Sequence, residues 1–93
     1  MKRSKENIFR VKLSKKAEKF LDKLPQRDRE RIISALRTLR ENPFSLDIKK
    51  LEGTEFHRVR VGKTFRIIVY IDWETKTIAV LRIDKRERVY DRL

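Results

Sequence analysis

Arginines in the middle of the chain are spaced so that they can bind phosphate. Residues 56–71 read FHRVRVGKTFRIIVYI, two alternating runs separated by Gly62. In a β-strand, side chains two positions apart share a face, so Arg58 and Arg60 point to the same side of the first run. Arginine offers a planar fork of donors and a permanent positive charge, which suit the oxygens of a phosphate backbone. The two runs therefore predict a hairpin with a phosphate-binding surface.

The length of the turn decides whether Arg66 joins this surface. A two-residue loop, Gly62–Lys63, would place Arg66 opposite Val59 and mix charge into the apolar face. A three-residue loop ending at Thr64 places Arg66 opposite Arg60 and leaves the other face wholly apolar. Because burial fixes strand register, we predict the three-residue loop.

The resulting arginine face, defined by Arg58, Arg60 and Arg66, needs a compensating charge. Like charges on opposed positions of an antiparallel pair destabilise it. Two interpretations follow from the residues alone. The face either binds a polyanion, or it is a solvated basic surface paired with neighbouring Glu and Asp side chains.

Composition favours a polyanionic partner and a small domain. The 93 residues carry a formal net charge of +12, and 43% of them are charged. A chain of this length supports one core, so we expect a single domain across residues 1–93. The charge favours nucleic acid over an acidic protein or an anionic membrane. Since no apolar run approaches a membrane span and the basic start does not resemble a signal peptide, a soluble, cytoplasmic protein is expected.

The sequence offers few metal ligands. It contains no cysteine and a single histidine, His57, so disulfides, thiolate sites and histidine-based metal sites are not expected. By parity His57 lies on the apolar side of its strand, which is more typical of a packed histidine than of a catalyst. No metal or cofactor is therefore predicted.

The elements around the hairpin follow from apolar periodicity. Alternation predicts a first strand at residues 8–13. Apolar residues at i, i+3, i+4 and i+7 after the N-cap Ser14 predict a helix that Pro25 ends, and a second amphipathic helix is predicted at residues 26–41. Residues 44–55 are predicted as a connecting loop. The apolar stripes of both helices are expected to cover the apolar face of the hairpin.

The last strand is predicted at residues 77–83, and a three-residue loop at residues 73–75 is predicted to set its faces. The apolar face would then receive Ala79, Leu81 and Ile83. The arginine face would receive Ile78, Val80 and Arg82, with Arg82 next to Arg66. Trp73, within the turn, is either an exposed contact or a lid over the hairpin.

The polar residues 84–93 are predicted as a tail, in which one helical turn brings Arg86 and Tyr90 to the same side.

The predicted fold class is therefore α+β. It consists of an N-terminal strand, an antiparallel helical hairpin and a three-stranded antiparallel meander, with the helices packed on one face of the sheet, and a short C-terminal tail.

Several segments resemble one protein family. The order of elements, LDIKKLEG at residues 46–53, HRVRVGKTFRIIVY at residues 57–70 and KRERVY at residues 85–90 resemble the RelE branch of the RelE/ParE toxin superfamily, particularly its archaeal members. The resemblance covers the chain from Ile8 to Tyr90. It implies a RelE-like domain and a ribosome-dependent endoribonuclease of a type II toxin–antitoxin pair, which cuts messenger RNA in the ribosomal A site and inhibits translation.

Carried over by position, the resemblance implies a catalytic set, which is Arg58, Arg60, Arg66, Arg86 and Tyr90. Beside the resemblance, further basic residues are predicted as RNA contacts because they precede the hairpin, lie on the arginine face or belong to the basic end of the chain. These are Lys49, Lys50, Arg82, Lys85 and Arg88. Many relatives have lysine where this chain has Arg58 and Arg60, so a neutralisable amine that could serve as general acid is absent there. The spacing from Arg86 to Tyr90 is also shorter than in some relatives.

Metal-free RNA cleavage by 2'-hydroxyl attack defines the roles open to these residues. The arginines of the hairpin suit the charge that develops on the phosphorane. Arg86 is expected at the scissile phosphate or the leaving group, and Tyr90 is either the base or a stacking platform for a nucleobase. Alternatively, Tyr90 only covers the edge of the core.

Two other functions stay open within the resemblance, and each of the three implies a partner. The chain is alternatively a ParE-like, non-enzymatic poison of DNA gyrase, or a catalytically inactive module that binds RNA or its antitoxin. In every case the resemblance and the positive charge imply a cognate acidic antitoxin that wraps the helices and the arginine face. The enzymatic reading adds the ribosome and messenger RNA as partners.

Overall fold

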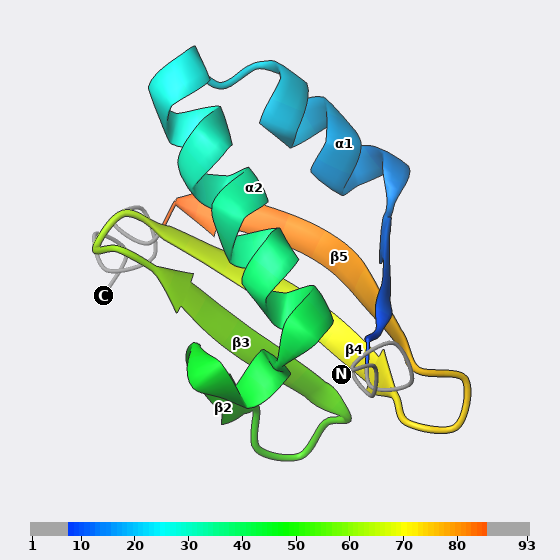
Figure 1. Cartoon of the computed structure of the whole chain (residues 1–93). Coiled ribbons are helices and arrows are strands. Elements are labelled where there is room, and N and C mark those ends of the chain that lie inside the picture. Colours follow the sequence, from blue (N-terminus) through cyan, green and yellow to red (C-terminus); the bar gives the residue numbers. More distant parts are fainter. Residues whose placement is uncertain (1–7, 86–93) are drawn as a thin grey trace.

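The structure, a computed structural model that describes residues 8–85, packs two helices on one face of a five-stranded sheet (Figure 1). The strands are β1 (Arg10–Leu13), β2 (Asp47–Lys50), β3 (Phe56–Val61), β4 (Phe65–Asp72) and β5 (Thr77–Lys85). Their spatial order is β1-β5-β4-β3-β2, in which β1 is parallel to β5 and the other neighbours are antiparallel. The helices are α1 (Lys15–Asp22) and α2 (Gln26–Glu41), with the short 3-10 helix η2 (Pro43–Ser45) after α2. The predicted α+β class is confirmed.

Ser14 connects the start of α1 to the last strand. Its hydroxyl accepts a hydrogen bond from the Ala17 amide at 3.0 Å, which satisfies one of the free donors at the helix N-terminus. The same hydroxyl donates to the Leu81 carbonyl at 2.7 Å. The predicted N-cap is therefore confirmed, and it also ties α1 to β5.

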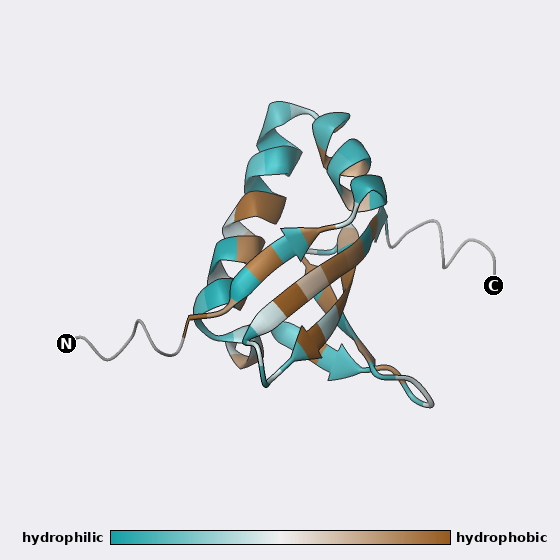
Figure 2. Ribbon diagram, turned by 90° about the vertical axis from the view of Figure 1, so that its right-hand side faces the viewer, coloured by the Kyte–Doolittle hydropathy of each residue, from teal (hydrophilic) through white to brown (hydrophobic). Residues whose placement is uncertain are grey.

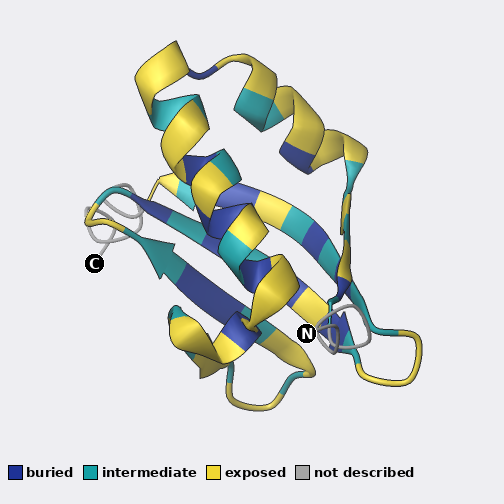
Figure 3. Cartoon of the chain, in the orientation of Figure 1, coloured by how far each residue is buried: buried dark blue, intermediate teal, exposed yellow. Residues whose placement is uncertain are grey.

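The core lies between the helices and the sheet. The fully buried side chains with the largest volumes are Phe65, Ile32, Leu39, Ile67, Ile78, Val59, Val69 and Val80. Figure 2 shows the apolar residues concentrated in the strands, with short apolar bands on otherwise hydrophilic helices. Figure 3 shows that the outer surfaces of both helices are exposed. The predicted covering of the apolar face by the helical stripes is confirmed.

The segment predicted as a loop at residues 44–55 contains a strand, so that prediction was wrong. β2 pairs antiparallel with β3 and places Ile48 opposite Val59. Its sequence, DIKK, carries a single apolar side chain, so it lacks the alternation by which a strand is recognised. The pairing with β3 supplies what the local sequence does not.

The predicted register of the last strand was also wrong. The loop after β4 has four residues, 73–76, because Asp72 Oδ1 accepts from the Glu74 and Thr75 amides and Lys76 adopts a left-handed φ of 55°. The extra residue reverses the parity of the strand. Ile78 and Val80 are consequently buried against the helices instead of joining the arginine face.

A β-bulge then restores the predicted faces further along β5. The register shifts between Ile68 and Val69, so that Ile83 pairs with Ile67 in the core and Arg82 pairs with Ile68 on the arginine face. Arg82 therefore lies on the predicted face, but its predicted place beside Arg66 was wrong, because Asp84 occupies that position. Leu81, the extra residue of β5 at the bulge, is the one whose carbonyl accepts from Ser14.

The end of the chain was predicted as a tail from residue 84. Asp84 and Lys85 instead belong to β5. The helical turn expected to bring Arg86 and Tyr90 together lies outside the described residues. Within residues 8–85, none of the helices combines the length and the apolar character that crossing a membrane requires.

Candidate functional site

The arginine face is the side of the sheet turned away from α1 and α2. The observed hairpin register sets Val61 opposite Phe65 and Arg60 opposite Arg66, which confirms the three-residue turn. Two rows of cross-strand partners cross this face. The first row is Asp47, Arg60, Arg66 and Asp84. The second row is Lys49, Arg58, Ile68 and Arg82. Four arginines thus lie within two adjacent rows on a rigid sheet.

Two aspartates partly neutralise this cluster. Asp47 lies 3.9 Å from Nη2 of Arg58 and 3.7 Å from Nη1 of Arg60. Asp84 lies 3.1 Å from Nε of Arg82. The pairing with acidic side chains that the sequence left open is therefore realised at these positions. Since the Asp47 contacts are long and its side chain is 58% exposed, they stabilise the fold by at most about 1 kcal/mol.

The arginines differ in how much of each can reach a ligand. The Arg58 side chain is only 10% exposed, whereas that of Arg60 is 39% exposed and that of Arg82 is 53% exposed. Arg66 is half-buried. Within residues 8–85, the buried Nε atoms of Arg60 and Arg66 have no hydrogen-bond acceptor. The face is therefore richer in donors than in acceptors, which favours an anionic ligand.

The other predicted contacts are not all brought to this face. Lys49 is exposed in the second row, beside Arg58. Lys50 pairs with His57, and Lys85 pairs with Phe65, so the register places both lysines on the opposite parity. The predicted residues Arg86, Arg88 and Tyr90 lie outside the described part of the chain.

His57 lies on the helix side of the sheet, as its parity predicted. Burial lowers the pKa of His57 below its usual value, and the charge of Lys50 lowers it further. Its buried Nδ1 has no hydrogen-bond partner among the described residues. These features fit a packed, neutral histidine.

The lowered pKa of His57 predicts acid destabilisation. Above its unfolded pKa of about 6.5 the histidine is neutral in both states. As the pH falls below that value, the unfolded chain binds a proton that the folded chain resists, so the free energy of unfolding decreases toward the folded pKa. Urea denaturation between pH 7.5 and pH 5.5 measures this slope. His57→Gln is expected to flatten it, and an unchanged slope in that variant would contradict the assignment.

Two features of the surface were not predicted from the sequence. Asp47 was assigned to a loop, so its position beside the arginines was not foreseen, and residues 47–50 carry no strand pattern that could have revealed it. Phe56 and Tyr70 share the strand parity of the arginines, but no role was predicted for either of them. They are register partners and pack edge to face, with ring centroids 6.4 Å apart.

Trp73 is an exposed contact and not a lid over the hairpin. Its ring stacks on Phe44 with centroids 5.8 Å apart and packs edge-on against Phe9 at 5.5 Å. Trp73 is 52% exposed and Phe44 is 56% exposed. This aromatic stack joins the β4–β5 loop to η2 and the start of β1.

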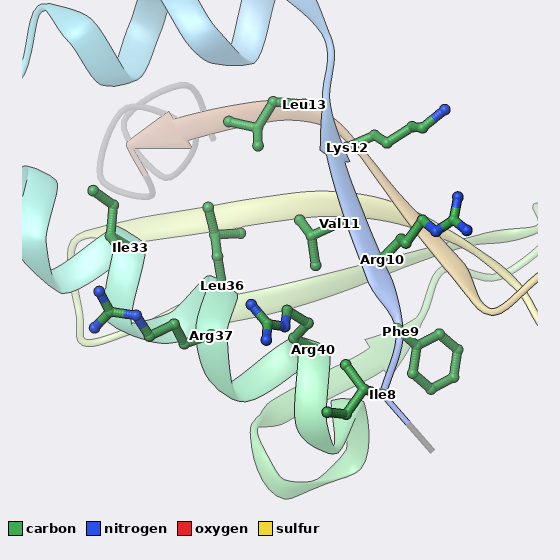
Figure 4. Close-up of a pocket in the computed structure, with 10 residues that line it drawn as sticks. All are labelled: Ile8, Phe9, Arg10, Val11, Lys12, Leu13, Ile33, Leu36, Arg37 and Arg40. Carbon is green, nitrogen blue, oxygen red and sulfur yellow. The ribbon is translucent and has the colours of Figure 1, made fainter. Parts of the chain in front are cut away.

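A second candidate surface is an open groove of about 750 Å³ between β1 and α2 (Figure 4). Val11 and Leu13 point into the groove toward α2, whereas Arg10 and Lys12 point away from it. The α2 side carries Ile33, Leu36, Arg37 and Arg40. The groove therefore combines an apolar floor with a basic side and fits a partner that is both apolar and acidic.

Comparisons with known proteins identify the family and the fold of the chain. The family model described as the ParE toxin of the type II toxin–antitoxin system parDE matches residues 11–90. The RelE toxin structure in an archaeal RelE–RelB complex from Pyrococcus horikoshii is 32% identical, with a TM-score of 0.76, over 87% of this chain and 98% of that chain.

Two further solved complexes are similar. The chain matches the RelB–RelE antitoxin–toxin complex from Methanococcus jannaschii at 30% identity and a TM-score of 0.68, over 89% of this chain and 99% of that one. It matches the RelBE2 toxin–antitoxin complex from Mycobacterium tuberculosis at 29% identity and a TM-score of 0.73, over 85% of this chain and 99% of that one. The family match, the identities and the shared fold together show that this chain belongs to the RelE/ParE toxin superfamily of type II toxin–antitoxin systems, on its RelE-like branch.

Proposed function

We propose that this RelE-like toxin is a metal-independent endoribonuclease that cuts messenger RNA in the ribosomal A site and thereby inhibits translation in the cytoplasm. The observation that carries the proposal is the register of the arginine face, which sets Arg60 opposite Arg66 with Arg58 and Arg82 in the next row. A non-enzymatic protein contact does not require such a concentration of fork-shaped donors on one side of a sheet.

The cleavage step needs charge stabilisation and two proton transfers. The 2'-oxygen forms a bond to phosphorus while the bond from phosphorus to the 5'-oxygen breaks, which leaves a 2',3'-cyclic phosphate and a 5'-hydroxyl. The 2'-proton goes to a base, and the departing 5'-oxygen takes a proton. Arg60 and Arg66 donate to the phosphorane oxygens as their negative charge grows.

Proton transfer is assigned to the end of the chain. Arginine has a pKa above about 12 and is a poor proton donor, so the hairpin arginines act through their charge. Tyr90 is the proposed base or stacking platform, and Arg86 acts on the scissile phosphate or the leaving group. A tyrosine has an ordinary pKa of about 10 and serves as base only where neighbouring cations lower that value.

A RelB-like acidic antitoxin is the proposed protein partner. The solved relatives from Pyrococcus horikoshii and Methanococcus jannaschii are complexes of RelE with RelB. In this chain the groove between β1 and α2 offers an apolar floor beside Arg37 and Arg40. An antitoxin segment with alternating apolar and acidic residues fits it, and a second acidic segment fits the arginine face.

Ribosome cleavage assays test the enzymatic proposal. A defined messenger RNA is incubated on programmed ribosomes with an empty A site, with free RNA as the control, and with the parent or the Arg86→Ala variant. Cuts that need the ribosome and vanish in the variant are expected. If neither protein cuts, salt-dependent RNA binding would identify an inactive binding module. Gyrase-dependent DNA damage with intact messenger RNA would identify a ParE-like function. That alternative is tested because the matched family model is described as a ParE toxin.

Asp47→Asn is expected to strengthen RNA binding. The Asp47 carboxylate lies near Arg58 and Arg60, where it competes with a phosphate for the same donors. Since exposed ion pairs contribute up to about 1 kcal/mol, the affinity should rise by up to about fivefold at low salt. Fluorescence anisotropy with labelled single-stranded RNA measures this change.

Asp28→Asn is the matched control for that variant. Asp28 forms a comparable surface ion pair with Arg31 at 4.0 Å, but it lies on α2, on the far side of the sheet from the arginine face. Both variants raise the net charge by one. Equal affinities of the two variants would show that Asp47 exerts only a global charge effect.

A further inference from the structure

The arginine face continues into an exposed aromatic pair. Phe56 of β3 and Tyr70 of β4 are cross-strand partners one row beyond Arg58 and Ile68. Their side chains remain 37% and 36% exposed although each belongs to a strand of the sheet. The rings meet edge to face at 76°, so each keeps part of a π-face uncovered. Exposed aromatic surface on a strongly basic side of a sheet needs a partner that is both flat and anionic.

We propose that Phe56 and Tyr70 bind an unpaired nucleobase of the RNA whose phosphates lie on the arginine face; the proposal rests on the function proposed above. Strand residues two positions apart are separated by about 6.6 Å. Phe56 and Tyr70 therefore lie about this distance beyond Arg58 and Ile68. The distance suits a nucleobase whose own phosphate is bound by the arginines. Every nucleobase has a π-face on which an aromatic ring can stack, so the pair is expected to bind all four bases without sequence preference.

The neighbours of the pair leave room for a base. On β5 the position beside Tyr70 is Ala79, and the next partner on β1 is Lys12. Alanine has only a methyl group, which covers little of the adjacent ring. Lys12 is exposed and adds a positive charge at the end of this row. The nearest acidic residue along β4, Asp72, accepts hydrogen bonds from the amides of its own loop.

The other exposed aromatic pair is arranged differently. Phe44 and Trp73 stack on each other at 11°, so each already covers one face of the other ring. They belong to η2 and the β4–β5 loop and are not in the rows of the arginine face. Phe44 therefore provides a control residue with the same chemistry and greater exposure.

The test removes the aromatic ring and the nucleobase in combination. The full-length protein is titrated onto programmed ribosomes whose messenger carries 2'-O-methyl groups in the A-site codon, so that 2'-oxygen attack is blocked. An abasic residue replaces each nucleotide in and beside that codon in turn. The variants are Tyr70→Ala, Phe56→Ala, Tyr70→Phe and the control Phe44→Ala, and circular dichroism verifies that each is folded.

For the parent, one abasic position is expected to weaken binding by about 5- to 140-fold. Tyr70→Ala and Phe56→Ala should bind the intact messenger more weakly than the parent does. In these variants the abasic substitution should cause little further loss of affinity. Removing the ring and removing the base abolish the same contact, so their effects on affinity do not add. Tyr70→Phe and Phe44→Ala should retain the full sensitivity. Arg60→Ala should weaken binding of every messenger alike and lower the salt dependence, because it removes a phosphate contact.

The failures of the two proposals are distinguishable. If the parent cuts unmodified messenger on these ribosomes, yet Tyr70→Ala and Phe56→Ala respond to every abasic position as the parent does, only the nucleobase site is refuted. If the parent neither cuts nor binds programmed ribosomes, the proposed function fails, and the nucleobase site fails with it.

Discussion

Replacing Arg66 with alanine is expected to slow ribosome-dependent cleavage of messenger RNA by about 10²- to 10³-fold, the usual effect of removing one donor that stabilises a developing oxyanion. Arg66 lies on β4, in the interior of the sheet, between Arg60 and Asp84 in the first row. It is half-buried, so its side chain has less conformational freedom to lose on binding than a fully exposed arginine has. Single-turnover cleavage rates at saturating enzyme measure the loss without the contribution of binding.

Two variants separate geometry from charge in this experiment. Arg66→Lys keeps the positive charge but loses the fork of donors, so its rate should lie between those of the parent and the alanine variant. Arg37→Ala removes the same charge from the exposed surface of α2 and should leave the rate near that of the parent. If Arg37→Ala slowed cleavage as much as Arg66→Ala, total charge and not the arginine face would control the rate.

The largest effect on stability is expected from Phe65→Ala, at about 3–5 kcal/mol. The Phe65 side chain is fully buried and packs edge-on against Phe20 of α1, with ring centroids 6.3 Å apart. Truncation removes the contact between sheet and helix and leaves a cavity under α1. Because a domain of this size has a free energy of unfolding of about 5–15 kcal/mol, the variant should unfold at a much lower urea concentration.

Phe44→Ala is the matched control for this prediction. Phe44 is 56% exposed and its stacking on Trp73 contributes no more than about 1.5 kcal/mol. Urea denaturation followed by circular dichroism compares the two variants directly. Similar midpoints for Phe65→Ala and Phe44→Ala would contradict the central position of Phe65 in the core.

The sequence predicted those parts of the fold in which only one face of an element is apolar. In the hairpin, Val59 and Ile67 alternate with Arg60 and Arg66, so only one register buries the apolar residues. In β5, by contrast, apolar residues occupy both parities, as 78–81 read IAVL. Parity then favours neither face. The register is decided by the four-residue loop, in which Asp72 accepts a hydrogen bond, and by the bulge, at which the Leu81 carbonyl accepts one.

The candidate site was predictable to the extent that it follows from strand parity. Parity brought Arg58, Arg60 and Arg66 together without any knowledge of the rest of the fold. It did not reveal Asp47, which lies on the edge strand β2 and is placed there by the pairing of β2 with β3. Nor did it reveal that Arg58 is buried, since burial depends on neighbouring elements and not on the alternation within a strand.

The hydrogen bond from Ser14 to Leu81 joins residues that are 67 positions apart in the sequence. Among the strands of residues 8–85, β1 is synthesised first and pairs only with β5, which is synthesised last. During translation β1 therefore has no strand partner until β5 has left the ribosome, and such distant pairings form slowly. Arg82 and Asp84 also arrive with β5. A nascent chain consequently lacks Arg82 and Asp84, which lie at the ends of the two rows, until β5 has been synthesised.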